Sequence, residues 1–225
     1  MPDEIQIITT GDGSHSLLNT ALNETYHSVH GARRESIHVF LKHGVEFFLK
    51  KNAIDVVKIF EVGFGTGLNA LLSASFAEQK QQRITYTSIE AFPLSFDIIH
   101  KLNYAESDVE KDLFAKLHAV AWENEVSMNN YFSLMKVKTT LQEVILPPQS
   151  FDVVFFDAFA PSKQPELWEI PMLKKIFDAL KLNGVFVTYC AKGQLKRDLK
   201  AIGFLVETLE GPPGKKEMVR ALKIS

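Results

Sequence analysis

Short apolar runs rich in β-branched residues recur along the chain from residue 56 onward. They cover residues 56–62, 83–90, 132–138, 151–157 and 184–189, and such runs are typical of strands buried on both faces of a sheet. The segments between them predict helices over 68–78, 94–102, 105–117, 141–145, 171–180 and 195–201. Strands that alternate with helices predict βαβ units and a mostly parallel sheet.

Both ends of the chain depart from this alternation. Near the C-terminus, residues 204–209 and 218–222 are predicted strands with only Glu-Gly-Pro-Pro-Gly-Lys-Lys between them, so they predict a hairpin with one strand antiparallel to the sheet. Near the N-terminus, the sequence predicts short strands over 4–9, 16–18 and 37–40, and a helix over 38–51.

A mostly parallel sheet that ends in an antiparallel hairpin resembles the sheet of class I methyltransferases. We therefore expect an α/β fold of the Rossmann-like, doubly wound kind, with a small N-terminal β element. Residues 1–50 are expected to form a β/helical elaboration and residues 51–225 the main domain, within one structural unit. A chain of 225 residues is long enough to bury such a core.

Composition excludes several classes of protein. The chain is 46% hydrophobic, yet no apolar segment is long enough to cross a bilayer, so no membrane association is expected. The first residues lack the basic start and apolar run of a signal peptide. The single cysteine, Cys190, cannot form an internal disulfide and is interpreted as a small buried apolar residue. These features predict that the protein is located in the reducing cytoplasm.

The charge is distributed unevenly. The net charge is −2, which argues against tight non-specific binding of polyanions. From residue 192 to the end, however, eight Lys and Arg face four Asp and Glu, and Arg33 and Arg34 form a second basic spot. Such clusters either contact phosphates or form solvated faces, and the sequence leaves both open.

A glycine cluster follows the first predicted strand of the main domain. The segment Glu61-Val-Gly63-Phe-Gly65-Thr-Gly67 opens a predicted helix, where glycines allow close backbone approach and the helix start offers free N–H groups. A dinucleotide site typically has G-x-G-x-x-G spacing, whereas G-x-G-x-G preceded by an acid resembles the methyltransferase loop. We interpret the loop as a nucleoside site; a tight turn without ligand is the alternative.

An acid closes the next strand. Glu90 lies 23 residues beyond Gly67, where a carboxylate can accept hydrogen bonds from both ribose hydroxyls, as in dinucleotide folds. Both Gly63 and Glu90 come at carboxyl ends of predicted strands, which is where open α/β sheets bind ligands. The alternative is a surface acid at a strand end.

The most distinctive segment is Phe151-Asp-Val-Val-Phe-Phe-Asp157-Ala-Phe159-Ala-Pro161. Asp157 lies where the fourth strand leaves the sheet, and a carboxylate there can hold an amine and accept its proton; capping the next helix is the alternative. Pro161 stiffens the loop. Phe159 and Trp168 offer flat faces either to a base or to the core.

Three segments together resemble one family. They are Glu-Val-Gly-Phe-Gly-Thr-Gly-Leu-Asn, Ser-Ile-Glu-Ala-Phe-Pro and Phe-Phe-Asp-Ala-Phe-Ala-Pro-Ser-Lys-Gln-Pro-Glu-Leu-Trp. On them the chain resembles the tRNA 5-methylaminomethyl-2-thiouridine methyltransferase family, over nearly its whole length. This family is the methyltransferase half of the bifunctional wobble-uridine modifying enzyme and also occurs as a stand-alone protein.

The resemblance implies S-adenosylmethionine as the cofactor and residues 51–225 as the domain that binds it. The loop from Glu61 through Gly63, Gly65 and Gly67 would wrap the methionine portion, and Glu90 would hold the ribose. Family members often place an acid after the third strand to hold the adenine amine; here Thr139 or backbone groups take that position.

The implied acceptor is the aminomethyl nitrogen of a wobble uridine in a tRNA anticodon loop. Asp157 would face the substrate amine, and Lys163, Lys215 and Lys216 would be tRNA contacts. The flavin-dependent oxidase half has no room in this chain, so a separate oxidase or another wobble-uridine modification enzyme is expected to supply the substrate.

Other interpretations share these motifs. An aminopropyltransferase or a small-molecule amine methyltransferase has the same fold, and a non-catalytic nucleoside- or RNA-binding module would lack a working Asp157. Glu24, His27 and His30 lie within seven residues, but no second ligand cluster accompanies them. We therefore expect no metal site and assign this segment to ordering the N-terminal element over the cofactor cleft or to contacting substrate.

Overall fold

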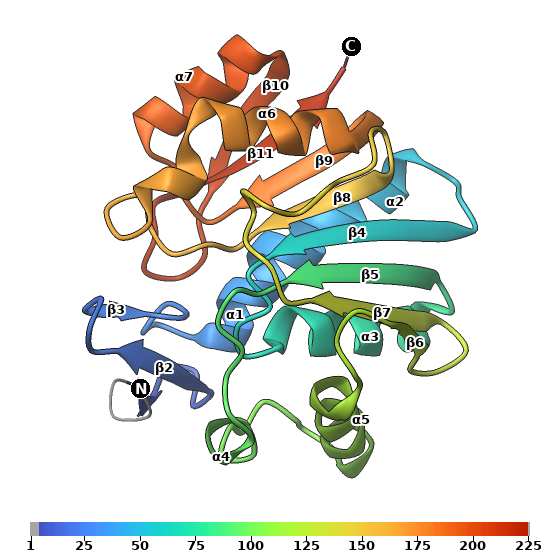
Figure 1. Ribbon diagram of the computed structural model, residues 1–225, viewed down its shortest axis with the longest axis vertical. Coiled ribbons are helices and arrows are strands. Elements are labelled where there is room, and N and C mark those ends of the chain that lie inside the picture. The colour runs from blue at the N-terminus through green and yellow to red at the C-terminus, as the bar shows by residue number, and fades with distance from the viewer. Residues whose placement is uncertain (1–4, 225) are drawn as a thin grey trace.

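The computed structural model describes residues 5–224, so Glu4 of the first predicted strand and the last residue of the predicted main domain lie outside it. Its centre is a sheet of eight strands (Figure 1). In spatial order these are β10 (Phe204–Glu210), β11 (Glu217–Lys223), β9 (Leu180–Thr188), β8 (Phe151–Phe156), β4 (Val56–Val62), β5 (Arg83–Ile89), β7 (Phe132–Val137) and β6 (Glu125–Ser127).

Strand direction confirms the expected doubly wound α/β fold. Strands β9, β8, β4, β5 and β7 pair in parallel, and the strand order reverses on either side of β4. Strand β11 is antiparallel to both β9 and β10, so the predicted C-terminal hairpin is confirmed. The sequence did not predict β6, a three-residue edge strand antiparallel to β7.

Both faces of the sheet are covered, as the continuous apolar strands require. Along β8, Val153 and Phe155 face one core and Val154 and Phe156 the other. The first core is closed by η2 (Ile37–Glu46), α3 (Leu68–Lys80) and α5 (Asp108–Ala119), and the second by α6 (Ile170–Ala179) and α7 (Gly193–Ile202). No helix among residues 5–224 is both long and apolar enough to span a bilayer.

The prediction of a strand over residues 37–40 is wrong. These residues belong to one continuous helical segment formed by α1 (Ala32–Ser36), η2 and α2 (Phe47–Lys51). Its buried side chains recur at helical spacing, and Gly44 lies so close to the sheet that an added Cβ would stand 3.1 Å from Phe155 and 3.2 Å from Val187. Tertiary packing therefore outweighs the local strand propensity of Ile-His-Val-Phe.

The predicted helix over residues 141–145 is also wrong. The segment forms turns, with the Val144 N–H bonded to the Thr140 carbonyl at 3.0 Å and the Glu143 N–H to the Thr140 hydroxyl at 3.2 Å. Pro147 and Pro148 follow directly and cannot extend a helix. A single turn without extension does not recover the cost of helix nucleation.

A small antiparallel sheet lies beyond the carboxyl ends of the parallel strands (Figure 1). It consists of β1 (Ile5–Thr9), β2 (His15–Asn19) and β3 (Glu24–Thr25). The first two confirm the predicted strands, and the sequence did not predict β3. This position places the N-terminal element over the edge where open α/β sheets bind ligands.

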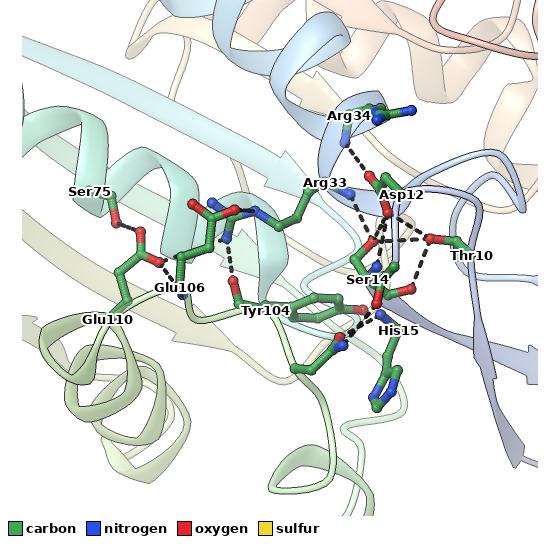
Figure 2. A network of polar contacts seen from close by, with 12 residues as sticks. Thr10, Asp12, Ser14, His15, Arg33, Arg34, Ser75, Tyr104, Glu106 and Glu110 are labelled. Atoms are coloured by element: carbon green, nitrogen blue, oxygen red, sulfur yellow. Dashed lines mark hydrogen bonds and ion pairs between the residues drawn. The ribbon is translucent and has the colours of Figure 1, made fainter.

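A polar network fastens this element to the main domain (Figure 2). Asp12 accepts hydrogen bonds from Ser14 and from the Arg34 N–H, which joins the β1–β2 turn to α1. The Arg33 guanidinium donates to the Tyr104 carbonyl and forms ion pairs with Glu106 at 3.1 Å and Glu110 at 3.8 Å. The start of α1 thus connects the small sheet to the segment that contains α4 and α5. Helix α4 covers Phe96–Ile99.

Candidate active site

One large cavity, about 1350 Å³, opens where the carboxyl ends of β4, β5, β7 and β8 meet the N-terminal sheet. The loops after these strands form its floor, and residues 19–30 contribute to its roof. Of the residues predicted for the site, those that line the cavity are Gly63, Gly65, Glu90, Thr139, Asp157, Phe159, Lys163 and Lys215. Separate stretches of the sequence therefore converge on one space.

The glycine loop has a backbone that only glycine adopts readily. Gly63, Gly65 and Gly67 have φ values of 92°, 50° and 74°. A Cβ on Gly63 would stand 2.8 Å from the Asp157 carbonyl, and one on Gly67 would stand 2.7 Å from the His118 ring. Gly67 therefore packs against the body of the protein, while Gly63 and Gly65 face the cavity.

The Glu90 carboxylate is held in place by backbone donors. The Gly65 N–H donates to its Oε2 at 2.9 Å, and the Phe92 N–H donates to its Oε1 at 2.8 Å. A carboxylate has about four acceptor positions, so both oxygens retain capacity for further donors. Burial and the Glu90 charge together raise the pKa of Tyr26 to about 12, so this roof residue is a neutral phenol beside Glu90.

The end of β7 completes this side of the cavity. The N–H groups of Glu90 and Thr139 both donate to the Val137 carbonyl, at 3.0 Å and 3.1 Å, so the two residues lie close together. Thr139 and Leu141 line the cavity together with Phe92, which is 80% exposed. This side of the cavity thus combines apolar side chains with the Thr139 hydroxyl.

Asp157 lies in the cavity wall directly after β8. Its N–H donates to the Val62 carbonyl at 3.1 Å, and its Oδ2 accepts a hydrogen bond from Asn69 at 2.8 Å. It does not cap a helix. Burial, aided by the negative charge of Glu35, raises the pKa of Asp157 to about 7, while the Asn69 hydrogen bond and Lys215 oppose the rise.

Glu61 lies beneath the cavity floor rather than in its lining. It is 1% exposed, and it accepts hydrogen bonds from Ser88 at 2.6 Å and from Asn69 at 3.0 Å. Burial raises the pKa of Glu61 to about 8. Sequence reasoning missed Asn69, although it lies two residues after Gly67 in the quoted motif.

Lys215 lines the cavity, and its side chain is 31% exposed. Its ammonium pairs with Glu35 of α1 and lies 3.8 Å from the centre of the Tyr189 ring. Glu35 is 5% exposed and also accepts the Ser28 N–H at 2.7 Å. The C-terminal hairpin is thereby tied to the N-terminal element across the cavity, a long-range contact that no local pattern in the sequence indicates.

The loop after β8 divides its residues between cavity and core. Phe159 lines the cavity, with its ring centre 5.0 Å from that of Tyr26 in an edge-on contact. Lys163 donates to the Leu22 carbonyl at 2.7 Å, and so fastens the roof. Trp168 is 6% exposed, packs on Phe156 and donates to the Phe159 carbonyl at 2.8 Å, so core packing accounts for it. Pro161 does not line the cavity.

The basic C-terminal region does not form one solvated patch. Lys196 pairs with Glu217, Arg220 with Glu207 and Lys215 with Glu35, while Lys223 donates to buried carbonyls. Arg33 is likewise engaged with acids. The exposed cations of this region are Lys192, Arg197, Lys200 and Lys216.

The N-terminal histidines do not assemble a metal site. His27 is buried against Ser16, and burial lowers its pKa to about 4. Glu24 and His30 line the cavity roof. Within residues 5–224, no cluster of three His, Cys, Asp or Glu side chains is arranged to hold a metal ion.

Comparisons with known proteins show which proteins this chain is similar to. A family model described as S-adenosyl-L-methionine-dependent methyltransferase matches residues 79–224. The tRNA 5-methylaminomethyl-2-thiouridine biosynthesis bifunctional proteins MnmC of Actinobacillus pleuropneumoniae and Methylobacillus flagellatus are 28% and 30% identical, over 92% and 87% of this chain. The matches cover 34% and 32% of those proteins, so the chain spans about a third of their length.

Two solved structures share the fold. The crystal structure of MNMC2 from Aquifex aeolicus superposes with a TM-score of 0.80 at 26% identity, covering 96% of this chain and 70% of that one. A spermidine synthase from Thermotoga maritima superposes with a TM-score of 0.59 at 14% identity, covering 97% and 69% of the two chains. The second likeness concerns the fold alone.

Proposed function

The chain belongs to the S-adenosyl-L-methionine-dependent methyltransferase family, and on that premise we propose that it methylates the aminomethyl nitrogen of a tRNA wobble uridine. The reaction would convert 5-aminomethyl-2-thiouridine to 5-methylaminomethyl-2-thiouridine. One observation carries the proposal: the Asp157 carboxyl group shares a cavity with the glycine loop and Glu90. The name of the bifunctional relatives supports this choice of product.

The cavity has the features that S-adenosylmethionine needs. Gly63 and Gly65 line the cavity with backbone alone, and Glu90 has acceptor capacity for ribose hydroxyls, while the lining residues Phe92 and Leu141 offer apolar surface for adenine. Acidic residues outnumber lysines in the lining: Glu24, Glu35, Glu90, Glu143, Asp157 and Glu166 against Lys163 and Lys215. This negative field suits a sulfonium and an amine, both of which are cations.

Asp157 would prepare the substrate amine. An alkylammonium has no free electron pair, so it must lose a proton before it attacks the electrophilic methyl group that the bound cofactor supplies. A carboxylate whose pKa has been raised to about 7 can bind the ammonium and take this proton near neutral pH. Phe159 and Tyr26 would exclude water from the same space.

Recognition of tRNA would use the rim of the cavity. Lys216 is exposed on the β10–β11 loop, next to the lining residue Lys215, and Lys192 is exposed at the start of α7. We further propose a cytoplasmic location, in agreement with the lone buried Cys190. A separate flavin-dependent oxidase or another wobble-uridine modification enzyme would supply the aminomethyl group.

The six acids in the lining also favour a second candidate, an aminopropyltransferase that binds a polyamine. Its donor would be decarboxylated S-adenosylmethionine, and the fold is that of the spermidine synthase. The Lys163 and Lys215 ammonium groups oppose a long polycation in the same space. Turnover with putrescine in place of tRNA separates the two candidates.

The proposal is tested by nucleoside mass spectrometry on tRNA that carries aminomethyl-uridine, incubated with the protein and S-adenosylmethionine. We expect one methyl group on the aminomethyl nitrogen with the native chain and none with Asp157→Ala, whose affinity for S-adenosylhomocysteine should stay within about threefold. The matched control is Asp152→Asn, because Asp152 lies on β8, the strand that leads to Asp157, but pairs with Lys181 and does not line the cavity. No mass shift with the native chain, or one that survives in Asp157→Ala, contradicts the proposal.

A further inference from the structure

Three polar side chains from different elements form a hydrogen-bonded chain that runs from beneath the cavity to its wall. Glu61 comes from β4, Asn69 from the first turn of α3 and Asp157 from the loop directly after β8. The Asn69 amide nitrogen lies 3.0 Å from Glu61 Oε1 and 2.8 Å from Asp157 Oδ2. One amide group thus joins two acidic side chains.

The orientation of this amide is set by the acids. An amide nitrogen carries two hydrogens, and each of the two contacts uses one of them. The Asn69 side chain is 4% exposed, and its Oδ1 has no hydrogen-bond partner among the described residues. Rotating the amide would lose both hydrogen bonds that its nitrogen makes, so the observed orientation is the favoured one.

Glu61 is fixed in turn from its other side. Ser88, on the neighbouring strand β5, donates to Glu61 Oε2 at 2.6 Å, so each carboxyl oxygen has a donor. Glu61 does not line the cavity, whereas Asn69 and Asp157 do. The route from Ser88 through Glu61 and Asn69 therefore ends at Asp157, the carboxyl group that the proposed function places against the substrate amine.

We propose that Asn69 is a positioning residue that aims the Asp157 carboxyl group, and that Glu61 acts by holding Asn69 rather than by binding the cofactor. The inference rests on the proposed function only in calling Asp157 the group that meets the amine. On this proposal, the acid just before the glycine loop, Glu61, stabilises another side chain of the protein and does not contact the cofactor.

The electrostatics of the site agree with this arrangement. The pKa of Glu61, raised by burial to about 8, keeps that carboxyl group neutral at pH 7, so Asn69 spans a neutral and a titrating acid. The groups that interact electrostatically with Asp157 are Glu35 from α1, Lys215 from the β10–β11 loop, Tyr189 after β9, Tyr86 from β5, Glu61 and Asn69. Among these, the Asn69 hydrogen bond and Lys215 lower the pKa of Asp157.

The test compares four single variants. Asn69→Leu keeps the side-chain size but removes both donors. Glu61→Leu removes the acceptor that holds Asn69, whereas Glu61→Gln preserves it. Ser73→Ala is the control, because Ser73 is another fully buried polar residue of α3 and its hydroxyl has no partner among the described residues. Circular dichroism and thermal melting establish that each variant is folded.

Two readouts are needed. The first is kcat and KM for aminomethyl-uridine tRNA as a function of pH, together with the affinity for S-adenosylhomocysteine. The second needs no substrate: the Asp157 carboxyl carbon is titrated by NMR in selectively labelled protein and assigned by its absence in Asp157→Asn. If the native chain methylates no tRNA, the proposed function fails, and the titration still tests the role of Asn69.

We expect Asn69→Leu and Glu61→Leu to lower kcat about 10- to 100-fold while the cofactor affinity changes less than about threefold. Glu61→Gln should retain more than about a third of kcat, and Ser73→Ala should match the native chain. The Asp157 titration and the acid limb of the rate profile should both move to higher pH in Asn69→Leu. An unmoved titration with kcat within twofold, or equal losses in Glu61→Gln and Glu61→Leu, overturns the inference; so does a loss confined to cofactor affinity.

Discussion

At the residue scale, the glycine loop sets a steric condition for binding the cofactor. Gly65 has φ of 50° and donates its N–H to Glu90, and a Cβ there would touch the Tyr26 ring at 3.4 Å. The Gly65→Val variant would bring a branched side chain into the cavity and strain the backbone.

We therefore expect Gly65→Val to reduce the affinity for S-adenosylhomocysteine by at least about 100-fold in isothermal titration calorimetry, since a displaced loop loses both its shape and its hold on Glu90. Gly193→Val is the matched control, because Gly193 has no positive φ and begins α7 outside the cavity lining. Undiminished binding by Gly65→Val would place the cofactor elsewhere.

A second residue-scale prediction concerns Glu61 and pH. Burial raises the pKa of Glu61 from 4.5 to about 8, so the folded protein holds a proton that the unfolded chain releases between these values. The stabilisation is complete below pH 4.5 and is lost as the pH rises through about 8. Asp157, with its pKa raised to about 7, acts in the same direction.

The Glu61→Gln variant is neutral at every pH and keeps the contacts to Asn69 and Ser88. We expect it to melt at about the same temperature as the native chain near pH 5 and several degrees higher at pH 8.5, measured by differential scanning calorimetry. Parallel curves for the two proteins between these pH values would mean that Glu61 is ionised in the fold.

At the scale of elements, the sequence predicts the central sheet well because each strand carries its own signal. The run Phe151–Phe156 is apolar at every position but one and is buried on both faces, as the pattern predicts. The strand prediction for residues 37–40 is wrong because a short apolar pattern of this kind also fits a buried helix. Here the helix packs on β8 and β9, which the local sequence does not indicate. Asn69 and the Lys215–Glu35 pair escape prediction since their partners are distant in sequence.

At this scale, the contacts of Arg33 at the start of α1 connect separate elements of the fold. The Arg33 side chain is 14% exposed and links α1 to Tyr104, Glu106 and Glu110, whereas the Arg34 side chain is exposed beside it. Arg33→Met should leave the Tyr104 carbonyl and Glu110 short of partners, which costs about 1–3 kcal/mol.

We expect Arg33→Met to melt roughly 2–8 °C lower and to exchange amide hydrogens faster over residues 10–36 and 102–110. Arg34→Met should match the native chain in both measurements. If the two variants behave alike, the network in Figure 2 does not fasten the N-terminal element.

At the scale of the whole molecule, acidic and basic residues occupy different surfaces: acids line the cavity, and exposed cations lie outside it. Acids dominate the lining, while Lys216 on the C-terminal hairpin and Lys192 at the start of α7 are exposed. Several basic residues of this region form ion pairs within the protein, so few exposed cations remain to bind phosphates. The sequence predicts the excess of basic residues but not this pairing, which depends on the fold.

The double variant Lys192→Gln, Lys216→Gln should therefore weaken tRNA binding and lower the slope of log affinity against log salt by about 1.5 to 2, with cofactor affinity unchanged. Filter binding at several salt concentrations measures the slope. The control pair Lys50→Gln, Lys80→Gln lies at the ends of α2 and α3, outside the cavity lining, and should leave the slope as it is. Equal effects from both pairs would argue for non-specific attraction alone.

The account as a whole depends on where the cofactor lies relative to Asp157. A crystal structure of the protein with S-adenosylmethionine tests this most directly. We predict ribose hydroxyls on the Glu90 carboxylate, the methionine portion along Gly63 and Gly65, and the sulfonium methyl group directed at the space beside Asp157. A cofactor bound outside this cavity, or one whose methyl group points away from Asp157, would contradict the account.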